Sequence, residues 1–333
     1  MNKRLKLFMI GSAVLLAIGC NRSDLIKKTV NVQDYSFEIT VLSRSAELNN
    51  ALDEAEKALK RRVSVFKGAK SELAQLNILR GPMAVSPEFE DLLKKVSQYS
   101  DVTNHVWNPV DGKLRRLWGL DKHDPYYPPP DSLMTALDEI SLTLLVRPDS
   151  GQAQLTGVGL LDLDRMALGW AVDGAAEAML AAGVKSGMIS IGSIYRTWGA
   201  PGPERRWEVP VYSPEKDSLR YRMEPPAGGM VEINLDRDGF SIGDSRFLPI
   251  FDIETGMPLS EPFSATATAP SCAEAAALAE ASLNMTRSEV FDELLKRLQP
   301  DSVGFFIIYS HDVLGYSAEA SPLLSSRITV DVP

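Results

Sequence analysis

Apolar and polar residues alternate with two different periods along this chain, which indicates a mixture of strands and helices. Residues 35–42 alternate with β-forming side chains and predict a first strand, whereas residues 46–62 carry apolar side chains at helical spacing and predict an amphipathic helix. The same patterns predict helices over 71–79, 87–99, 166–182, 271–285 and 288–298, strands over 186–192, 207–212 and 303–309, and surface connections over 121–131 and 214–230. Because helices and strands interleave, the pattern predicts an α+β fold without a clean domain break.

The longest apolar run lies at the N-terminus, between cationic residues and a cysteine. Three cationic residues precede the apolar run 7–18, which stops at Gly19 and Cys20. Twelve residues of helix rise about 18 Å, less than a hydrocarbon core of about 30 Å. The run is therefore typical of a cleaved signal peptide. A small residue before a cysteine resembles the lipobox of bacterial lipoproteins; the alternative is an ordinary signal peptide that happens to contain a cysteine.

These features predict how the chain is divided and where it is located. We expect a lipoprotein signal peptide over 1–19, a lipid on Cys20, an anchor and polar tether over 20–34, and one domain over 35–333. The protein would then be anchored by its lipid to a bacterial membrane, with its body on the periplasmic or extracytoplasmic side.

Charge and cysteine content exclude several classes of protein. The formal charge is −9, and loss of the three cations of the signal peptide leaves −12. An acidic body argues against a nucleic-acid partner. Only Cys272 remains once Cys20 is acylated, so no internal disulfide is expected, and the three histidines are too widely spaced for a zinc-type pair.

Four segments carry the candidate chemistry. They are residues 63–77, residues 103–119 with Trp107-Asn-Pro109, residues 161–173 followed by 189–192, and residues 249–258 with Pro249-Ile-Phe-Asp252, followed by 265–285. In this order and spacing they resemble the ApbE family, the FAD:protein FMN transferases, from about residue 35 to about residue 298. The resemblance implies a mixed or antiparallel β-sheet core flanked by helices, in one compact two-lobed domain.

The resemblance also implies flavin chemistry. Members of the family bind FAD with Mg²⁺, split its pyrophosphate and attach FMN to a Thr or Ser of an exported flavoprotein subunit of an electron-transfer complex. Phosphoryl transfer of this kind depends on positioning and on a cation that neutralises phosphate charge. The family's cofactor-binding positions correspond to Phe66, Val106, Trp107, Asn108, Asp162, Leu168, Ile250 and Asp252, and its metal positions to Arg165, Ala276 and Glu280.

Several of these positions depart from the family pattern. The family's C-terminal helix carries an Asp and, four residues on, a Thr, which face the metal together. Here that pair is Ala276 and Glu280, and the alanine has no side-chain oxygen. In the family's glycine-rich loop, Asp164 and Arg165 replace glycine, and Leu168 replaces a lysine that could meet phosphate.

Two functions of different class remain open. The first is a Mg²⁺-dependent FMN transferase, with a metal site rebuilt from Asp164, Glu274 and Glu280. The second is a catalytically degenerate ApbE-like lipoprotein that binds a flavin or a partner, which the changes at both metal-facing positions favour. A solute-binding lipoprotein is a third possibility, but it predicts two similar lobes and a hinge, which this sequence does not show.

Overall fold

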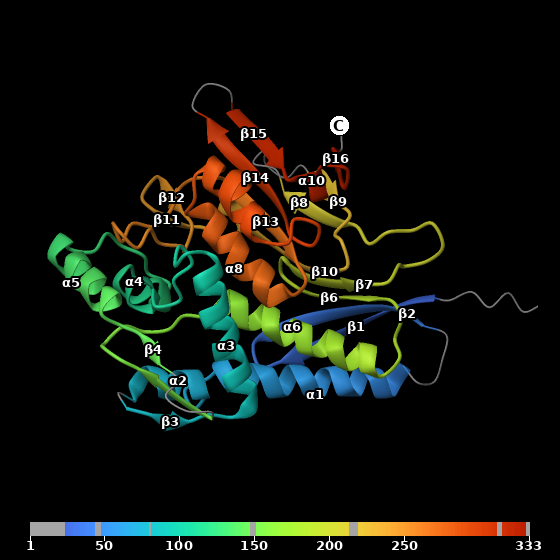
Figure 1. The fold of residues 1–333 in the computed structure, drawn as a ribbon, viewed down its shortest axis with the longest axis horizontal. Coiled ribbons are helices and arrows are strands. Elements are labelled where there is room, and N and C mark those ends of the chain that lie inside the picture. The colour runs from blue at the N-terminus through green and yellow to red at the C-terminus, as the bar shows by residue number, and fades with distance from the viewer. Residues whose placement is uncertain are drawn as a thin grey trace, which may run out of the picture.

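An eight-stranded antiparallel sheet organises the structure, a computed structural model that describes residues 24–43, 48–79, 81–146, 151–212, 219–311 and 315–330 (Figure 1). The strand order is β1-β2-β6-β7-β10-β13-β14-β15, so β1 and β15 are its edges. The strands span Asp24–Val32 (β1), Tyr35–Ser43 (β2), Gly187–Ile191 (β6), Ile194–Trp198 (β7), Gly228–Asn234 (β10), Ser264–Ala269 (β13), Gly304–His311 (β14) and Gly315–Ala320 (β15).

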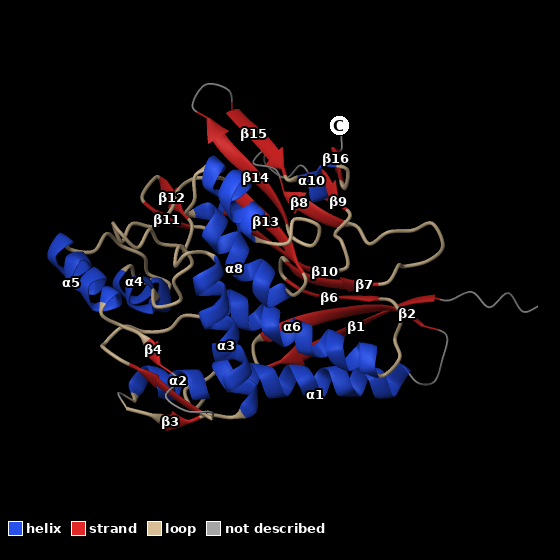
Figure 2. Cartoon of the chain, viewed as in Figure 1, coloured by secondary structure: helices blue, strands red, loops and turns tan. Residues whose placement is uncertain are grey.

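Three helices pack side by side against one face of this sheet (Figure 2). They are α1 (Leu48–Phe66), α6 (Asp164–Ala181) and α8 (Cys272–Leu283). In α1, Leu52, Ala55 and Leu59 are buried at spacings of three and four, the pattern of one helix face. The two Ala-rich helices α6 and α8 bury most of their residues on all sides, because they lie between the sheet and other helices.

Small residues allow α6 and α8 to approach closely. A Cβ added at Gly169 of α6 would lie 2.7 Å from the carbonyl carbon of Cys272. The Asp173 carboxylate, also on α6, accepts hydrogen bonds from the backbone N–H groups of Cys272 (2.8 Å) and Ala273 (3.1 Å). Because these N–H groups begin α8, Asp173 satisfies donors that a helix start leaves unpaired. The contact fixes the position of α8 relative to α6.

A smaller sheet covers part of the opposite face. It has the order β16-β9-β8, with β8 at Val209–Tyr212, β9 at Leu219–Met223 and β16 at Ile328–Val330, next to the short helix α10 (Pro322–Ser325). Met223 and Val211 of this sheet pack with Met230 and Phe306 of the large sheet in a second hydrophobic core. The large sheet is therefore buried on both faces in its central part.

Most of the remaining elements lie around one end of the sheet and the helices (left and lower left in Figure 1). The hydroxyls of Ser71 and Ser86 cap the starts of two of their helices, α2 and α3, by accepting from the backbone N–H groups of Ala74 and Phe89. The remaining elements are α2 (Glu72–Ile78), β3 (Met83–Ala84), α3 (Pro87–Val102), α4 (Gly112–Leu117), η1 (Leu120–Lys122), α5 (Pro130–Ser141), β4 (Leu145–Val146), β5 (Gln152–Leu155), α7 (Leu235–Asp238), β11 (Phe240–Ile242), β12 (Ser245–Phe247), the π-helical η2 (Glu289–Leu294) and α9 (Leu295–Arg297).

The predicted fold class, α+β with an antiparallel sheet core flanked by helices, is confirmed. The predicted strand at 35–42 is β2, and the predicted helices at 46–62, 87–99, 166–182 and 271–285 are α1, α3, α6 and α8. In the described part of the chain, no helix combines the length and apolarity that crossing a membrane requires. The predicted signal peptide and the lipid on Cys20 lie outside the described residues.

The structure differs from the expected tether over 20–34. Residues 24–32 form β1, which pairs with β2 along its whole length. Val30 and Val32 are buried, while Thr29 and Asn31 beside them are more exposed. This alternation belongs to an edge strand with one face on the core. The run of polar residues around the two valines hides the alternation in the sequence.

Candidate functional site

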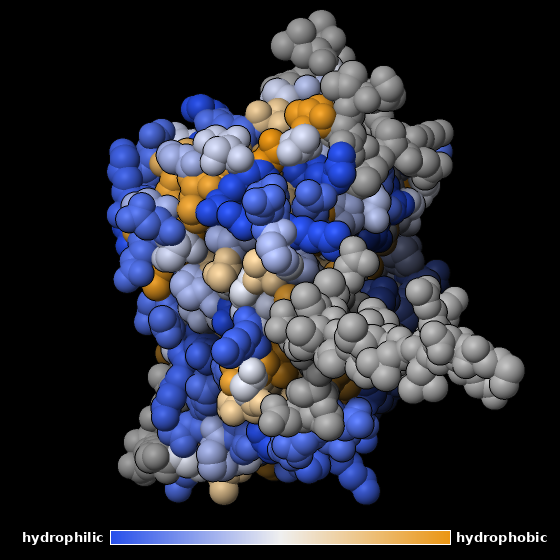
Figure 3. All heavy atoms as spheres, turned by 90° about the vertical axis from the view of Figure 1, so that its right-hand side faces the viewer, coloured by the Kyte–Doolittle hydropathy of each residue, from blue (hydrophilic) through white to orange (hydrophobic). Residues whose placement is uncertain are grey.

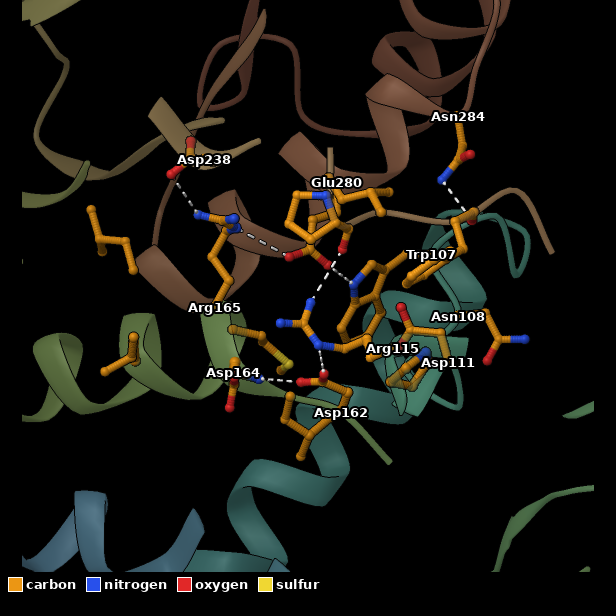
Figure 4. Close-up of a pocket in the computed structure, with 18 of the residues that line it drawn as sticks. Trp107, Asn108, Asp111, Arg115, Asp162, Asp164, Arg165, Asp238, Glu280 and Asn284 are labelled. Carbon is orange, nitrogen blue, oxygen red and sulfur yellow. Dashed lines mark hydrogen bonds and ion pairs between the residues drawn. The ribbon is translucent and has the colours of Figure 1, made fainter. Parts of the chain in front are cut away.

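A cavity of about 520 Å³ lies where α6, α8, α7 and several loops meet (Figure 4). Its wall includes the start of α6, the second half of α8, the turn between β6 and β7, and the segments 106–115 and 249–253. These parts are far apart in sequence, and the packing of α6 against α8 brings them together.

The chain reverses its direction sharply after α3, and this turn places Trp107 in the cavity wall. Asn104 and His105 have φ angles of +54° and +63°, a left-handed conformation in which Asn and His are enriched. After the reversal, the Thr103 hydroxyl accepts a hydrogen bond from the backbone N–H of Trp107 (3.3 Å). The indole thereby points toward α8.

The next few residues join the loop before α6. The backbone N–H of Gly112 donates to the carbonyl of Leu160 (3.1 Å), and the N–H of Asp162 donates to the carbonyl of Pro109 (2.8 Å). A Cβ on Gly112 would lie 3.0 Å from the Leu160 carbonyl oxygen, so glycine permits this close approach. This pairing places Arg115 beside Asp162.

Glu280 of α8 lies between two donors in the cavity. Its Oε2 accepts a hydrogen bond from Trp107 Nε1 (2.7 Å), and its Oε1 lies 3.3 Å from Arg165 Nε. Arg165 also lies 4.0 Å from Asp238 of α7, so its guanidinium stands between two carboxylates (Figure 4). Burial raises the pKa of Glu280, although Arg165 and Trp107 act in the opposite direction.

Asp162 forms a second cluster with Arg115. Arg115 Nε lies 2.6 Å from Asp162 Oδ2, and Arg115 Nη1 donates to the carbonyl of Pro249 (3.2 Å). The other carboxylate oxygen of Asp162 accepts a hydrogen bond from the backbone N–H of Asp164 (3.1 Å). The Asp162 carboxylate thus occupies the N-terminus of α6, where helices attract anions.

Two further carboxyl groups near Asp162 have altered acidity. Burial, with the Asp162 charge in second place, raises the pKa of Asp111 well above its ordinary value. The Asp162 charge, followed by burial, raises the pKa of Asp164. Negative charge is therefore crowded on this side of the cavity.

Apolar side chains form much of the remaining wall. Trp107, Met166, Leu168 and Ile250 line the cavity, and Tyr35 contributes an aromatic ring with a hydroxyl. Burial raises the pKa of Tyr35 to about 12, so the hydroxyl keeps its proton at neutral pH. An apolar wall with a few polar groups is typical of small-molecule sites.

Eight of the eleven residues predicted from the family positions line this cavity; they are Val106, Trp107, Asn108, Asp162, Arg165, Leu168, Ile250 and Glu280. The fold therefore brings most of the predicted set together. Whether these side chains contact a flavin stays a prediction.

Phe66, Asp252 and Ala276 lie outside the cavity lining. Phe66 is buried at the end of α1, where its ring packs against Tyr35 at a centroid distance of 6.4 Å. Asp252 lies in an adjoining hollow and accepts hydrogen bonds from the backbone N–H groups of Glu254 and Thr255, so it shapes a turn. Ala276 is completely buried within α8.

The side chains at the family's metal positions do not fit Mg²⁺, which prefers several oxygen ligands in a near-octahedral arrangement. Ala276 offers no oxygen, and the Glu280 carboxylate is already bonded to Arg165 and Trp107. Across the six described ranges, no three His, Cys, Asp or Glu side chains form a group that could hold a metal ion. The rebuilt metal site predicted from Asp164, Glu274 and Glu280 is therefore wrong: Glu274 does not line the cavity.

Several charged residues of the cavity were not predicted from the sequence. Asp111, Arg115, Arg237 and Asp238 all line it, and none of them is among the eleven residues at the family positions. Arg115 pairs with Asp162, and Asp238 pairs with Arg165. Of these four residues, only Asp111 and Arg115 belong to one of the four candidate segments. Their position inside such a segment is the sequence signal that could have identified them as site residues.

Comparisons with known proteins agree with this architecture. The sequence model of the ApbE family matches residues 33–304. The FAD:protein FMN transferase of Vibrio cholerae is 25% identical over 197 residues, which cover 57% of this chain and 59% of that protein. The Haemophilus influenzae protein of the same name is 24% identical over 239 residues, 68% of each chain. This chain therefore spans less than two thirds of the Vibrio cholerae relative.

Solved structures show the same fold. The ApbE protein of Thermotoga maritima superposes with a TM-score of 0.78 at 19% identity, covering 90% of this chain and 97% of that one. The flavin transferase ApbE of Vibrio cholerae superposes with a TM-score of 0.75 at 19% identity, covering 92% and 100%. Since the family model matches most of the sequence and the fold agrees, this chain is a member of the ApbE family.

Proposed function

We propose that this protein binds a flavin in the cavity and does not carry out Mg²⁺-dependent transfer of FMN. The bonding of Glu280 carries the proposal. This carboxylate occupies a metal position of the family, yet Arg165 and Trp107 hold both of its oxygens. To bind a cation, Glu280 would have to release Arg165, and Ala276 would supply no second ligand. Loss of even an outer-shell partner of a metal ligand costs about 10–100-fold in metal affinity, so loss of a ligand itself should weaken Mg²⁺ binding at least as much.

The cavity itself supports flavin binding. Its volume of about 520 Å³ lies in the usual range for small-molecule pockets, roughly 300–1,000 Å³. The apolar side chains of Trp107, Met166 and Ile250 suit a planar aromatic ring system. Asn108 and Tyr35 also line the cavity and carry an amide and a hydroxyl that could make polar contacts. Relatives at 24% and 25% identity are named FAD:protein FMN transferases, which favours a flavin as the ligand class.

The test separates binding from transfer. The full chain, purified in detergent, is titrated with riboflavin, FMN and FAD in EDTA by isothermal titration calorimetry. The same protein is then incubated with FAD, Mg²⁺ and an exported flavoprotein acceptor, and covalent flavin is detected by in-gel fluorescence. The Vibrio cholerae transferase serves as the positive control. We expect saturable binding of a flavin and no fluorescent acceptor. A fluorescent band would refute the loss of transfer, and no heat with any flavin would refute the binding.

FMN transfer is the second candidate function. Two observations favour it: Asp162 keeps the family's residue and lines the cavity, and the relatives are named for this activity. Transfer would require a phosphate-bound cation at Glu280 or another source of positive charge. The acceptor experiment decides between the two functions directly.

The location belongs to the same proposal. A lipid on Cys20 would hold the body on the periplasmic or extracytoplasmic side of a bacterial membrane, where an exported flavoprotein subunit of an electron-transfer complex is the expected partner. Labelling with radioactive palmitate tests the anchor. The wild-type chain should incorporate label and Cys20→Ala should not, whereas equal labelling of both would refute the lipid at this cysteine.

A further inference from the structure

We infer that the cavity selects an uncharged flavin of the riboflavin class over the phosphorylated forms FMN and FAD. The inference rests on the proposed flavin binding and specifies its ligand. Two observations support the inference: carboxyl groups outnumber arginines on the cavity wall, and each of these arginines already pairs with a carboxylate.

Acidic side chains outnumber basic ones around the cavity. Three arginines line it, together with five carboxyl side chains, so the formal balance is −2. Within the described residues, neither lysine nor histidine reaches the lining. The charged lining residues are Arg115, Arg165, Arg237, Asp111, Asp162, Asp164, Asp238 and Glu280. An added phosphate would therefore find more carboxyl groups than guanidinium groups on the wall.

Each arginine of the lining is also engaged by a carboxylate. Arg115 lies 2.6 Å from Asp162, and Arg165 lies 3.3 Å from Glu280. Arg237 lies 2.9 Å from Asp238 and 2.8 Å from the buried Glu232 outside the cavity. A phosphate that recruited one of these guanidinium groups would leave a carboxylate unpaired in a poorly solvated place, which is unfavourable.

The other usual sources of phosphate contacts are occupied as well. The Asp162 carboxylate accepts from the first backbone N–H group of α6, where a phosphate would otherwise bind. The Ser193 hydroxyl, in the turn between β6 and β7, donates to the carbonyl of Glu232 (2.7 Å). Leu168 on the same wall is apolar. The first N–H group of α6 and the Ser193 hydroxyl are thus already engaged by the protein's own groups.

Neutral polar groups remain suitable for an uncharged ligand. The Asn108 carbonyl oxygen accepts from the backbone N–H of Val110 (2.9 Å), which orients the amide N–H₂ as a donor. Tyr35 carries a hydroxyl on the cavity wall, which also includes the apolar Met166 and Ile250. Amide and hydroxyl groups match the carbonyls and ring nitrogens of an isoalloxazine and the hydroxyls of its ribityl chain.

Calorimetric titration with riboflavin, FMN and FAD in EDTA at about physiological salt tests the inference. We expect riboflavin to bind at least tenfold more tightly than FAD, and the gap to narrow at higher salt because salt screens the repulsion. Equal or tighter binding of FAD by the wild-type protein would overturn the selectivity. If none of the three binds, the proposed flavin function itself fails, which is a separate outcome.

Charge variants supply the second arm of the experiment. Asp238→Asn removes one lining carboxylate and one of the two acidic partners of Arg165 and of Arg237, so it should tighten FAD relative to riboflavin at least threefold. Asp236→Asn, on the same short helix but outside the lining, is the matched control and should change neither. Because Asp238 also accepts from the backbone N–H of Asn234, Leu168→Lys is a second variant; it adds a cation to the lining and should likewise tighten FAD relative to riboflavin at least threefold. Equal changes for riboflavin and FAD in both variants would refute the electrostatic selection.

Discussion

At the scale of single residues, Arg165 and Glu280 both depart from the family pattern, and they form a pair. Their pairing explains why the two departures together do not destabilise the site. A glutamate in place of a metal-facing residue would leave a poorly solvated charge, and the arginine on the facing helix compensates it at 3.3 Å. The two changes are complementary, so each should be costly without the other.

A double-mutant cycle tests this coupling. Arg165→Met leaves Glu280 without its ionic partner and should lower the free energy of unfolding by about 1–3 kcal/mol, below the range for fully buried pairs because both side chains are partly exposed. The double variant Arg165→Met/Glu280→Gln should recover at least half of this loss in urea denaturation. Arg116→Met, an exposed arginine outside the cavity, is the control. Simple additivity of the two substitutions would contradict the coupling.

Cys272 gives a second prediction at this scale. Its side chain is completely buried at the start of α8, and burial raises the pKa of its thiol well above the ordinary value. Because the thiolate is the reactive form, iodoacetamide at pH 8 should modify the native protein at least a hundredfold more slowly than the urea-unfolded protein. Mass spectrometry of Cys272 measures both rates, with a cysteine-containing peptide as reference. Similar rates would mean that the α6–α8 contact opens readily.

At the scale of elements, the contact between α6 and α8 sets the geometry of the cavity. Arg165 and Glu280 belong to these two helices, and the same contact includes Gly169 and the Asp173 carboxylate. The many alanines in residues 166–182 and 271–285 can be read from the sequence, and such small side chains allow helices to pack closely. Which helix they would pack against cannot be read from it, because helical periodicity identifies a buried face but not its partner.

Gly169→Ala should disturb this contact. The added methyl group would lie 2.7 Å from backbone atoms of Cys272, so the helices must separate. Overpacking of this kind costs about 1–3 kcal/mol, and flavin affinity should fall because the cavity spans both helices. Gly81→Ala is the control, since no atom lies within 4 Å of the place that its new methyl group would occupy. Thermal and urea unfolding measure the difference; equal stability of the two variants would contradict the close contact.

Glu232 of β10 predicts a pH effect. Burial raises the pKa of this carboxyl group, although Arg237 acts against the shift. The folded protein therefore holds this proton to a higher pH than the unfolded chain. The contribution of Glu232 is fully present below the ordinary carboxyl pKa and is lost as pH rises through the folded value.

Comparison with Glu232→Gln checks the sign. The glutamine cannot titrate, so its stability relative to the wild type should improve steadily from pH 4.5 to pH 7.5 in urea denaturation. Glu54→Gln, on the exposed face of α1, should show no such trend. A relative loss of stability on raising the pH would mean that the ion pair with Arg237 outweighs burial.

At the scale of the whole molecule, local patterns predicted elements well and their assembly poorly. The long periodic segments became β2, α1, α6 and α8 because their apolar spacing reflects a buried face. The central strands β10 and β13 were not predicted, since their residues are buried on both faces and lack alternation. The cavity followed the family motifs in most positions, but its charge balance depends on Arg237 and Asp238, which enter only through the tertiary fold.

The surface has the polar character that the composition indicates. Figure 3 shows a mostly hydrophilic face with apolar atoms in small separate areas. The whole chain carries 44 acidic and 35 basic residues. A partner that meets this face would contact mainly polar side chains, so we expect their association to weaken with salt.

The start of the domain gives a prediction at the same scale. In a tether, a charged side chain would leave the stability unchanged at any position. In β1, its effect on stability depends on which face of the sheet the side chain lies on. Val30→Asp places a carboxylate at a side chain only 3% exposed and should cost about 3 kcal/mol or more in urea unfolding. Asn31→Asp, on the exposed face, should stay within about 0.5 kcal/mol. If the two substitutions lowered the stability equally, residues 24–32 would behave as a tether and not as a strand.

Because β1 begins at Asp24, the linker between Cys20 and the first strand of the sheet is only a few residues long. The four residue steps from Cys20 to Asp24 span at most about 14 Å even when fully extended. An acyl chain on Cys20 would therefore dock one edge of the sheet against the lipid headgroups instead of letting the body swing freely. Leu25 and Ile26, exposed at 45% and 38%, would meet that interface first. The anchor would then set which way the protein faces, and a partner would have to approach from the sides that remain open.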